Sequence, residues 1–159
     1  MKKIGLPAFL FLVTFSLFGQ TKITKLGVVG KWVISAVEMT GMFYYSVEND
    51  SLGFGEMIKA QVADTSQLKA VTGMIKTQLT VFTKMAFIFN TDGTAELENG
   101  IDQAQAASYS VNEENSTITT IDKDKKEDTM KAEMLLEKLR ISVKQPEGEI
   151  FMLLKKVKR

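Results

Sequence analysis

The sequence predicts a mainly β protein, an antiparallel up-and-down barrel of seven or eight short strands with a helical insert near residues 55–82. Two observations support this fold class. Short apolar runs with a period of two recur along the chain, separated by turn sequences at a spacing of about 8–12 residues. Between the first strand and the others, the apolar period changes to that of a helix. A sandwich would fit the same pattern, but a closed barrel leaves no edge strand to protect, so we favour the barrel.

The first strand is expected at residues 31–39, a segment rich in β-branched and aromatic residues that begins after Gly30. Residues 43–45 are expected to continue it beyond a break at Gly41. Residues 49–55 contain Asn, Asp, Ser and two glycines, which predicts a loop.

The helical insert begins with a short helix around Met57, Ile58 and Val62. Asp64, followed three residues later by Gln67, resembles a capping box that starts a second helix. An apolar stripe at steps of three and four residues then predicts about four helical turns. The stripe consists of Leu68, Val71, Ile75, Leu79 and Phe82. It is expected either to plug the open end of the barrel or to act as a lid.

The remaining chain predicts paired strands. Residues 85–89 have a period of two, with Met85, Phe87 and Phe89 on one face, and lead into the hairpin turn 90–93, with residues 94–98 returning. A second hairpin is expected from residues 107–111 and 117–121. A solvated charged loop is expected at 122–128, followed by a strand at 129–136 and a cleanly alternating strand at 138–144. A turn at 145–148 then leads into the closing strand at 150–157.

Residues 1–19 have the pattern of a cleaved secretory signal. Lys2 and Lys3 precede an uncharged, mostly apolar stretch at 4–18, and Gly19 follows it. The stretch is shorter than the roughly 20 residues that span a bilayer, and the sequence has no Cys to carry a lipid. We therefore expect a single domain at 20–159 that is exported, periplasmic or secreted, not a lipoprotein and without a stable membrane anchor.

Composition excludes several function classes. The chain contains no His and no Cys, which removes cysteine and histidine nucleophiles, the Ser-His-Asp triad and thiolate or imidazole metal sites. Residues 20–159 carry 18 basic and 19 acidic side chains, a balance unlike that of a nucleic-acid-binding protein. The carboxylate pairs Asp122/Asp124 and Glu113/Glu114 lie in turns without apolar shielding. We expect no catalytic residue, no metal and no cofactor.

Three motifs occur in order along the chain. Gly30-Lys31-Trp32 opens the first strand, Phe87-Ile88-Phe89-Asn90-Thr91-Asp92-Gly93-Thr94 forms a hairpin, and Tyr109-Ser110-Val111 leads into another. Together they resemble the exported lipocalin-like (calycin) barrels of Gram-negative bacteria. The resemblance implies a barrel with an apolar interior whose structural motif residues are Gly30, Trp32, Asn90, Asp92 and Gly93. It also implies an Arg from a late strand above the Trp, and neither Arg140 nor Arg159 falls securely at that position.

The sequence offers one candidate ligand site, formed by aromatic and apolar side chains predicted to face the interior or the mouth of the barrel. These are Phe43, Tyr45, Met85, Phe87, Phe89, Tyr109, Met134 and Ile141. Trp32 would be a plug at the barrel base or the floor of a cavity. The first hypothesis is a non-enzymatic protein that binds a small apolar or amphipathic molecule. The alternative is a structural or interaction module of the cell envelope with a filled barrel, and a third is a hydrolase or isomerase that uses carboxylates and Tyr. The oligomeric state stays open.

Overall fold

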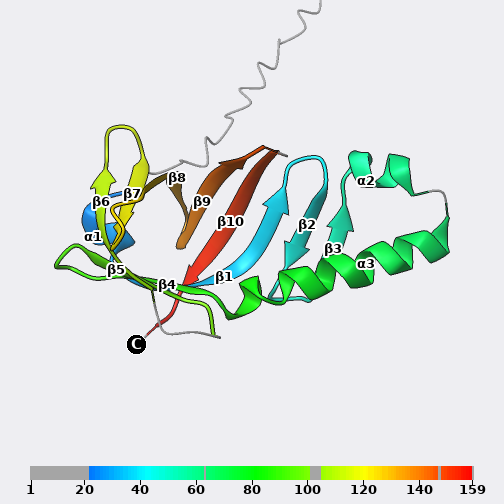
Figure 1. Ribbon diagram of the computed structural model, residues 1–159, viewed down its shortest axis with the longest axis horizontal. Coiled ribbons are helices and arrows are strands. Elements are labelled where there is room, and N and C mark those ends of the chain that lie inside the picture. The colour runs from blue at the N-terminus through cyan, green and yellow to red at the C-terminus, as the bar shows by residue number, and fades with distance from the viewer. Residues whose placement is uncertain (1–21, 63, 101–104, 147, 159) are drawn as a thin grey trace, which may run out of the picture.

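The computed structural model describes residues 22–62, 64–100, 105–146 and 148–158 (Figure 1). The predicted signal at 1–19 therefore lies outside the described residues. In the described residues, ten strands form one antiparallel sheet, and eight of them close into a barrel. The barrel strands are β1 (Gly30–Met39), β4 (Ala86–Phe89), β5 (Thr94–Glu98), β6 (Gln105–Asn112), β7 (Thr117–Asp122), β8 (Glu127–Leu135), β9 (Lys138–Gln145) and β10 (Gly148–Lys156).

Strand β1 closes the barrel. Its first residues, Gly30–Val33, pair with β4, while Trp32–Met39 pair on the other edge with β10. The register with β10 shifts between Ile34 and Ala36, and the Ser35 hydroxyl between them donates to the Leu153 carbonyl at 2.9 Å. This bulge bends the long strand, as a barrel wall requires. The predicted fold class, an antiparallel barrel with a helical insert, is confirmed.

The expectation of a loop at residues 49–55 is wrong in part. Residues Ser51–Phe54 form strand β3, which pairs with β2 (Phe43–Ser46), and β2 pairs with the second half of β1. The 43–45 segment is thus a separate strand of a hairpin. Asp50 takes a φ of +45° in the turn between β2 and β3. The polar, glycine-containing segment is a strand because β2 supplies its hydrogen bonds.

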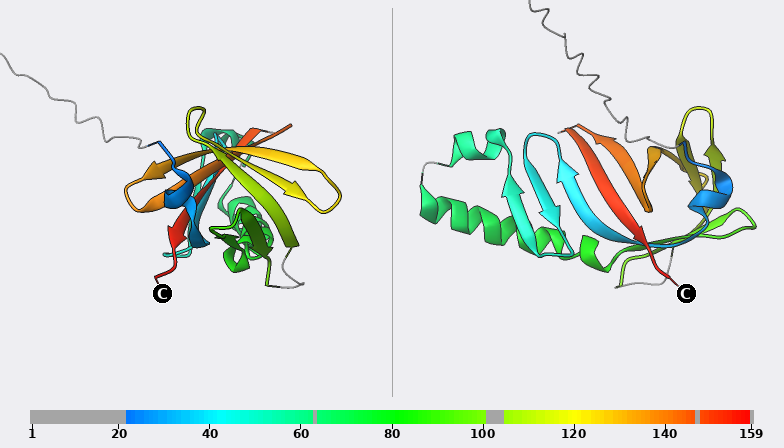
Figure 2. Two further views of the ribbon diagram at one scale, coloured as in Figure 1. Left: turned by 90° about the vertical axis from the view of Figure 1, so that its left-hand side faces the viewer. Right: turned by 180° about the vertical axis from the view of Figure 1, so that it is seen from behind.

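The helical insert is confirmed as α2 (Glu56–Gln61), α3 (Thr65–Leu79) and the 3₁₀ turn η1 (Phe82–Lys84). The Asp64 carboxylate caps α3 by accepting hydrogen bonds from the backbone N–H groups of Ser66 and Gln67. Helix α3 ends three residues before Phe82, so the predicted stripe is divided between the helix and η1. Both figures show α3 running alongside β2 and β3 (Figure 2).

The hydrophobic core lies inside the barrel. The alternation expected at 138–144 is observed, since Leu139 and Ile141 are fully buried while Arg140 faces outward. At the hairpin between β4 and β5, Gly93 has a φ of +90°, as the sequence predicts. Asp92 accepts two hydrogen bonds there from Thr94, one from its backbone N–H and one from its hydroxyl.

Among the described residues, no helix combines the length and the apolar character that a membrane crossing requires.

Candidate functional site

One end of the barrel, which we call the base, is sealed around Trp32. The Trp32 side chain is 1% exposed, and its indole N–H donates to the Val28 carbonyl at 2.7 Å. Val28 belongs to α1 (Lys25–Val28), a short helix that packs with fully buried Ile23. Residues just before the first strand therefore form the floor of the barrel.

A lysine lies above the Trp at the base. Lys156, in the last strand, pairs with Trp32 across the β1–β10 ladder and places its Nζ atom 5.1 Å from the centre of the indole ring. Gly30 leaves room for it, since a Cβ at that position would come 2.6 Å from Lys156 Cε. The resemblance implies an Arg at a comparable position. Arg140 instead lies on the outer face of β9, paired across the ladder with Leu153.

The predicted ligand-contact residues all belong to one apolar cluster. Four of them are buried core residues, namely Tyr45, Phe89, Tyr109 and Ile141. The other four are partly buried and pack against that core, namely Phe43, Met85, Phe87 and Met134. The structure thus brings the eight residues into one connected region. None of them lines either of the two pockets described below.

Two buried tyrosines in this cluster have hydrogen-bond partners. The Tyr109 hydroxyl donates to the Asn90 carbonyl at 2.8 Å, and its ring meets Phe89 edge-on at 5.0 Å. Burial, then the Asp92 carboxylate, raises the pKa of Tyr109. Burial, followed by a hydrogen bond to Asp50, raises the pKa of Tyr45. Both hydroxyls therefore stay protonated at neutral pH and act as structural donors.

The opposite end of the barrel, which we call the mouth, is apolar and partly exposed. Its residues lie toward the strand ends away from Trp32, and their side chains point to the same side of the sheet as those of the buried core. They are Met130, Val143 and Ile150. Each is partly accessible to solvent, whereas Ile118, Leu139 and Leu154 deeper in the barrel are fully buried. Solvent therefore reaches apolar surface at the mouth.

Helix α3 leads through η1 into β4, whose first residue, Ala86, pairs with Val33 of β1. Leu79, near the end of α3, is 4% exposed and belongs to the core, and Ile75 and Phe82 pack against it. Lys76 holds the helix to the turn after β2, with its Nζ 2.8 Å from the Asp50 carbonyl and 2.9 Å from the Asp50 carboxylate. The second half of α3 is thus anchored.

The first half of α3 is more loosely covered. Leu68 and Val71 are partly exposed, and a groove of about 350 Å³ separates this part of α3 from α2. Ile58 and Val71 lie on opposite sides of that groove. The predicted stripe is therefore core at its C-terminal end and partly solvent-accessible at its N-terminal end.

Three adjacent aromatic residues in β2 divide between the two sides of the sheet. Phe43 and Tyr45 share the face of the core, while Tyr44 is 48% exposed on the other face. This division follows from the two-residue period of a strand.

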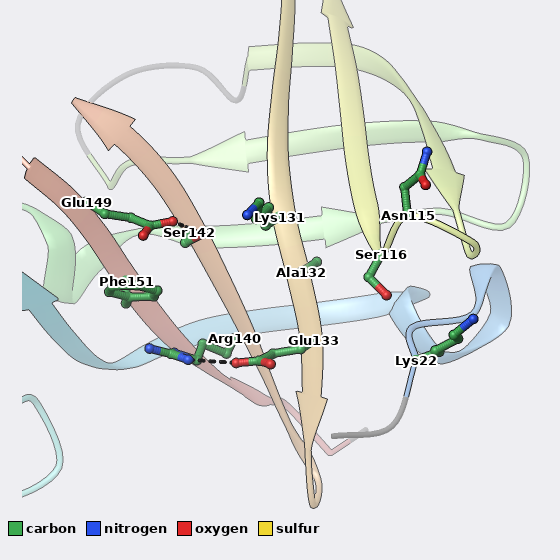
Figure 3. A pocket seen from close by; sticks show the side chains of 10 residues that line it. All are labelled: Lys22, Asn115, Ser116, Lys131, Ala132, Glu133, Arg140, Ser142, Glu149 and Phe151. Carbon is green, nitrogen blue, oxygen red and sulfur yellow. Dashed lines mark hydrogen bonds and ion pairs between the residues drawn. The ribbon is translucent and has the colours of Figure 1, made fainter. Parts of the chain in front are cut away.

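A larger pocket of about 560 Å³ lies on the outer face of the barrel, over β8, β9 and β10 (Figure 3). We call it the outer pocket. Its lining residues are Lys22, Asn115, Ser116, Lys131, Ala132, Glu133, Arg140, Ser142, Glu149 and Phe151. Sequence reasoning missed it, because the alternating pattern assigns Arg140 and Ser142 only to an outward polar face.

One carboxylate of each acidic pair considered from the sequence accepts hydrogen bonds from backbone N–H groups. Asp122 accepts hydrogen bonds from the backbone N–H groups of Asp124 and Lys126, and Glu113 accepts one from Lys25. In the part of the chain that the structure describes, no three acidic side chains gather as a metal ion would need.

Comparisons of the chain with models of protein families, with curated proteins and with solved structures find no match. Function is therefore inferred from the geometry of the chain itself.

Proposed function

We propose that this protein is a non-enzymatic, lipocalin-like binding protein that holds a small apolar or amphipathic molecule at the barrel mouth, beside α3. The observation that carries the proposal is the partly exposed apolar mouth above a sealed base. The partly exposed side chains of Met130, Val143 and Ile150 lie toward the end of the barrel away from Trp32. Covering such surface with an apolar ligand releases about 25 cal/mol per Å².

The filled lower half of the barrel limits how deep a ligand enters. Ile118, Leu139 and Leu154 are fully buried, and an eight-stranded barrel has an interior just wide enough for its own side chains. A ligand would therefore sit shallowly and contact α3. The anchored C-terminal half of that helix would form one wall of the site.

The proposal includes export. The charged, apolar and small-residue segments of 1–19 support a cleaved signal, and a protein without Cys has no need of a disulfide-forming partner in that compartment. Intact-mass measurement of the protein from its own cells tests this part: the mass should lack the signal, and a full-length N-terminus would refute export.

A fluorescence titration with a dansyl-labelled fatty acid tests binding at the mouth. The variant Val143→Trp places a large ring among partly exposed mouth residues, and we expect it to weaken binding at least about tenfold by occupying the site. The matched control is Ile121→Trp, on the outer face of β7, where the native side chain is 41% exposed. Equal binding by the two variants, or no saturable binding by the native protein, would refute the proposal.

A second candidate function is an interaction module whose barrel is filled. It is favoured by the complete burial of the lower core and by the position of the outer pocket outside the barrel. The same titration separates the candidates, since a filled barrel would not bind the labelled fatty acid at all.

A further inference from the structure

The geometry points to the outer pocket as a second binding site, one that takes a small organic anion with a flat apolar part, such as an aromatic carboxylate. This inference is independent of binding at the mouth, since the two sites lie on opposite faces of the barrel wall.

The pocket exists because β8 extends beyond the residue that pairs with the start of β7. The ladder between these strands stops at Thr117 and Lys131, while β8 continues to Leu135 beside β9. Ser116, just before β7, has a φ of +53°, which turns the chain away. The outer face of β8 is thereby left open between β9 on one side and the turn at 115–116 on the other. Figure 3 shows Lys131, Ala132 and Glu133 on β8, with the lining residues of β9 and β10 on one side of this strand and Asn115, Ser116 and Lys22 on the other.

The β9–β10 side of the outer pocket is preorganised. The Arg140 guanidinium donates to the Glu133 carboxylate at 2.7 Å and lies 4.0 Å from the centre of the Phe151 ring. Ser142 is 8% exposed and donates to Glu149 at 2.8 Å. These contacts hold a flat surface, formed by a guanidinium and an aromatic ring, in a fixed orientation.

The acceptors of the pocket are engaged, whereas several of its donors are free. Both carboxylates accept the hydrogen bonds just described. Among the described residues, the side chains of Lys22, Asn115, Ser116 and Lys131 form no hydrogen bond or ion pair. A ligand that enters the pocket therefore meets unpaired cations and amide or hydroxyl donors.

These two sides define the ligand class. The three cations outnumber the two carboxylates of the pocket, and free ammonium groups favour an anion over a cation. The Phe151–Arg140 surface favours a planar group beside that anion. A carboxylate attached to an aromatic ring satisfies both requirements, and a volume of about 560 Å³ accommodates it.

Amide chemical-shift titration by NMR with benzoate tests the inference and locates the binding. We expect saturable shifts at Lys131, Ser142 and Phe151, and no saturable shifts there with benzylamine, which has the opposite charge. Lys131→Glu should weaken benzoate binding about tenfold. Lys123→Glu, on the loop between β7 and β8, makes the same change of charge outside the pocket and should leave the affinity unchanged.

Glu133→Gln distinguishes anion binding in the outer pocket from a purely structural role of Glu133 and Arg140. This variant removes the charge that neutralises Arg140, so benzoate should bind several-fold more tightly, and the gain should shrink as salt is raised. The inference is overturned if benzoate gives no saturable shifts at these residues, if Lys131→Glu and Lys123→Glu bind it equally, or if Glu133→Gln binds it no better. Shifts confined to the mouth would also overturn it.

Discussion

Removing the Trp32 side chain should destabilise the whole domain. The indole is 1% exposed and contacts the floor of the barrel, so Trp32→Ala loses its transfer free energy and leaves a cavity, at a cost of about 3–5 kcal/mol. The variant also leaves the Val28 carbonyl without its 2.7 Å donor. Loss of a donor to a buried acceptor costs about 1–3 kcal/mol.

Trp32→Phe separates the two contributions. It retains a ring in the barrel base but removes the indole N–H, so we expect a loss of about 1–3 kcal/mol, smaller than that of Trp32→Ala. Urea unfolding followed by far-UV circular dichroism measures both variants, because the native fluorophore is lost in them. The m-value should stay unchanged if only stability is affected.

Tyr44→Ala is the matched control for this experiment. Tyr44 lies 48% exposed on the outer face of β2, so its truncation should change stability by no more than about 0.5 kcal/mol. If Trp32→Ala lost less than about 1 kcal/mol, or no more than Tyr44→Ala, the sealed base would be refuted.

Three further predictions concern the turns and α3. Gly93→Val should lower the free energy of unfolding in urea by about 1–3 kcal/mol, because a β-branched residue is strained at a φ of +90°. Unchanged stability would contradict the positive φ of Gly93 in the turn between β4 and β5. Lys76→Met should lower stability more at neutral pH than in acid, because its bond to the Asp50 carboxylate depends on pH and its bond to the Asp50 carbonyl does not. Hydrogen bonds from Lys76, then Tyr45, lower the pKa of Asp50, so this stability is present above the ordinary Asp pKa and is lost as the pH falls through the lowered one. A pH-independent difference in urea midpoint would be inconsistent with this. Leu79→Ala, at a 4% exposed position, should lose about 2–5 kcal/mol, and the partly exposed Leu68→Ala clearly less; equal losses would show that α3 is anchored along its whole length.

Local patterns predict most of the barrel because they depend on neighbours in the sequence. The alternation at 138–144 places Leu139 and Ile141 in the core, and Asp64 with its following residues is sufficient to start α3. Strand β3 is different. Its residues have no strand pattern of their own, and they are extended because β2 provides a pairing edge.

The sites depend on register between distant strands, which a single sequence does not contain. Lys156 reaches Trp32 only through the pairing of the first strand with the last. Arg140 and Glu133 meet across the β8–β9 hairpin, but Lys22 and Asn115 reach the same pocket from distant parts of the chain. The candidate residues at the core could be selected from polarity and aromatic character, but the outer pocket combines charges that look like ordinary solvated side chains.

Hydrogen exchange of α3 tests the binding proposal most directly. Because Leu68 and Val71 are partly exposed and Leu79 is buried, the first half of α3 should exchange faster than β9 and β10 in the free protein. A saturating fatty acid at the mouth should slow exchange across α3 and η1 while leaving the base around Trp32 unchanged. Protection of α3 equal to that of the strands, with no response to the fatty acid, would contradict a binding site at the mouth.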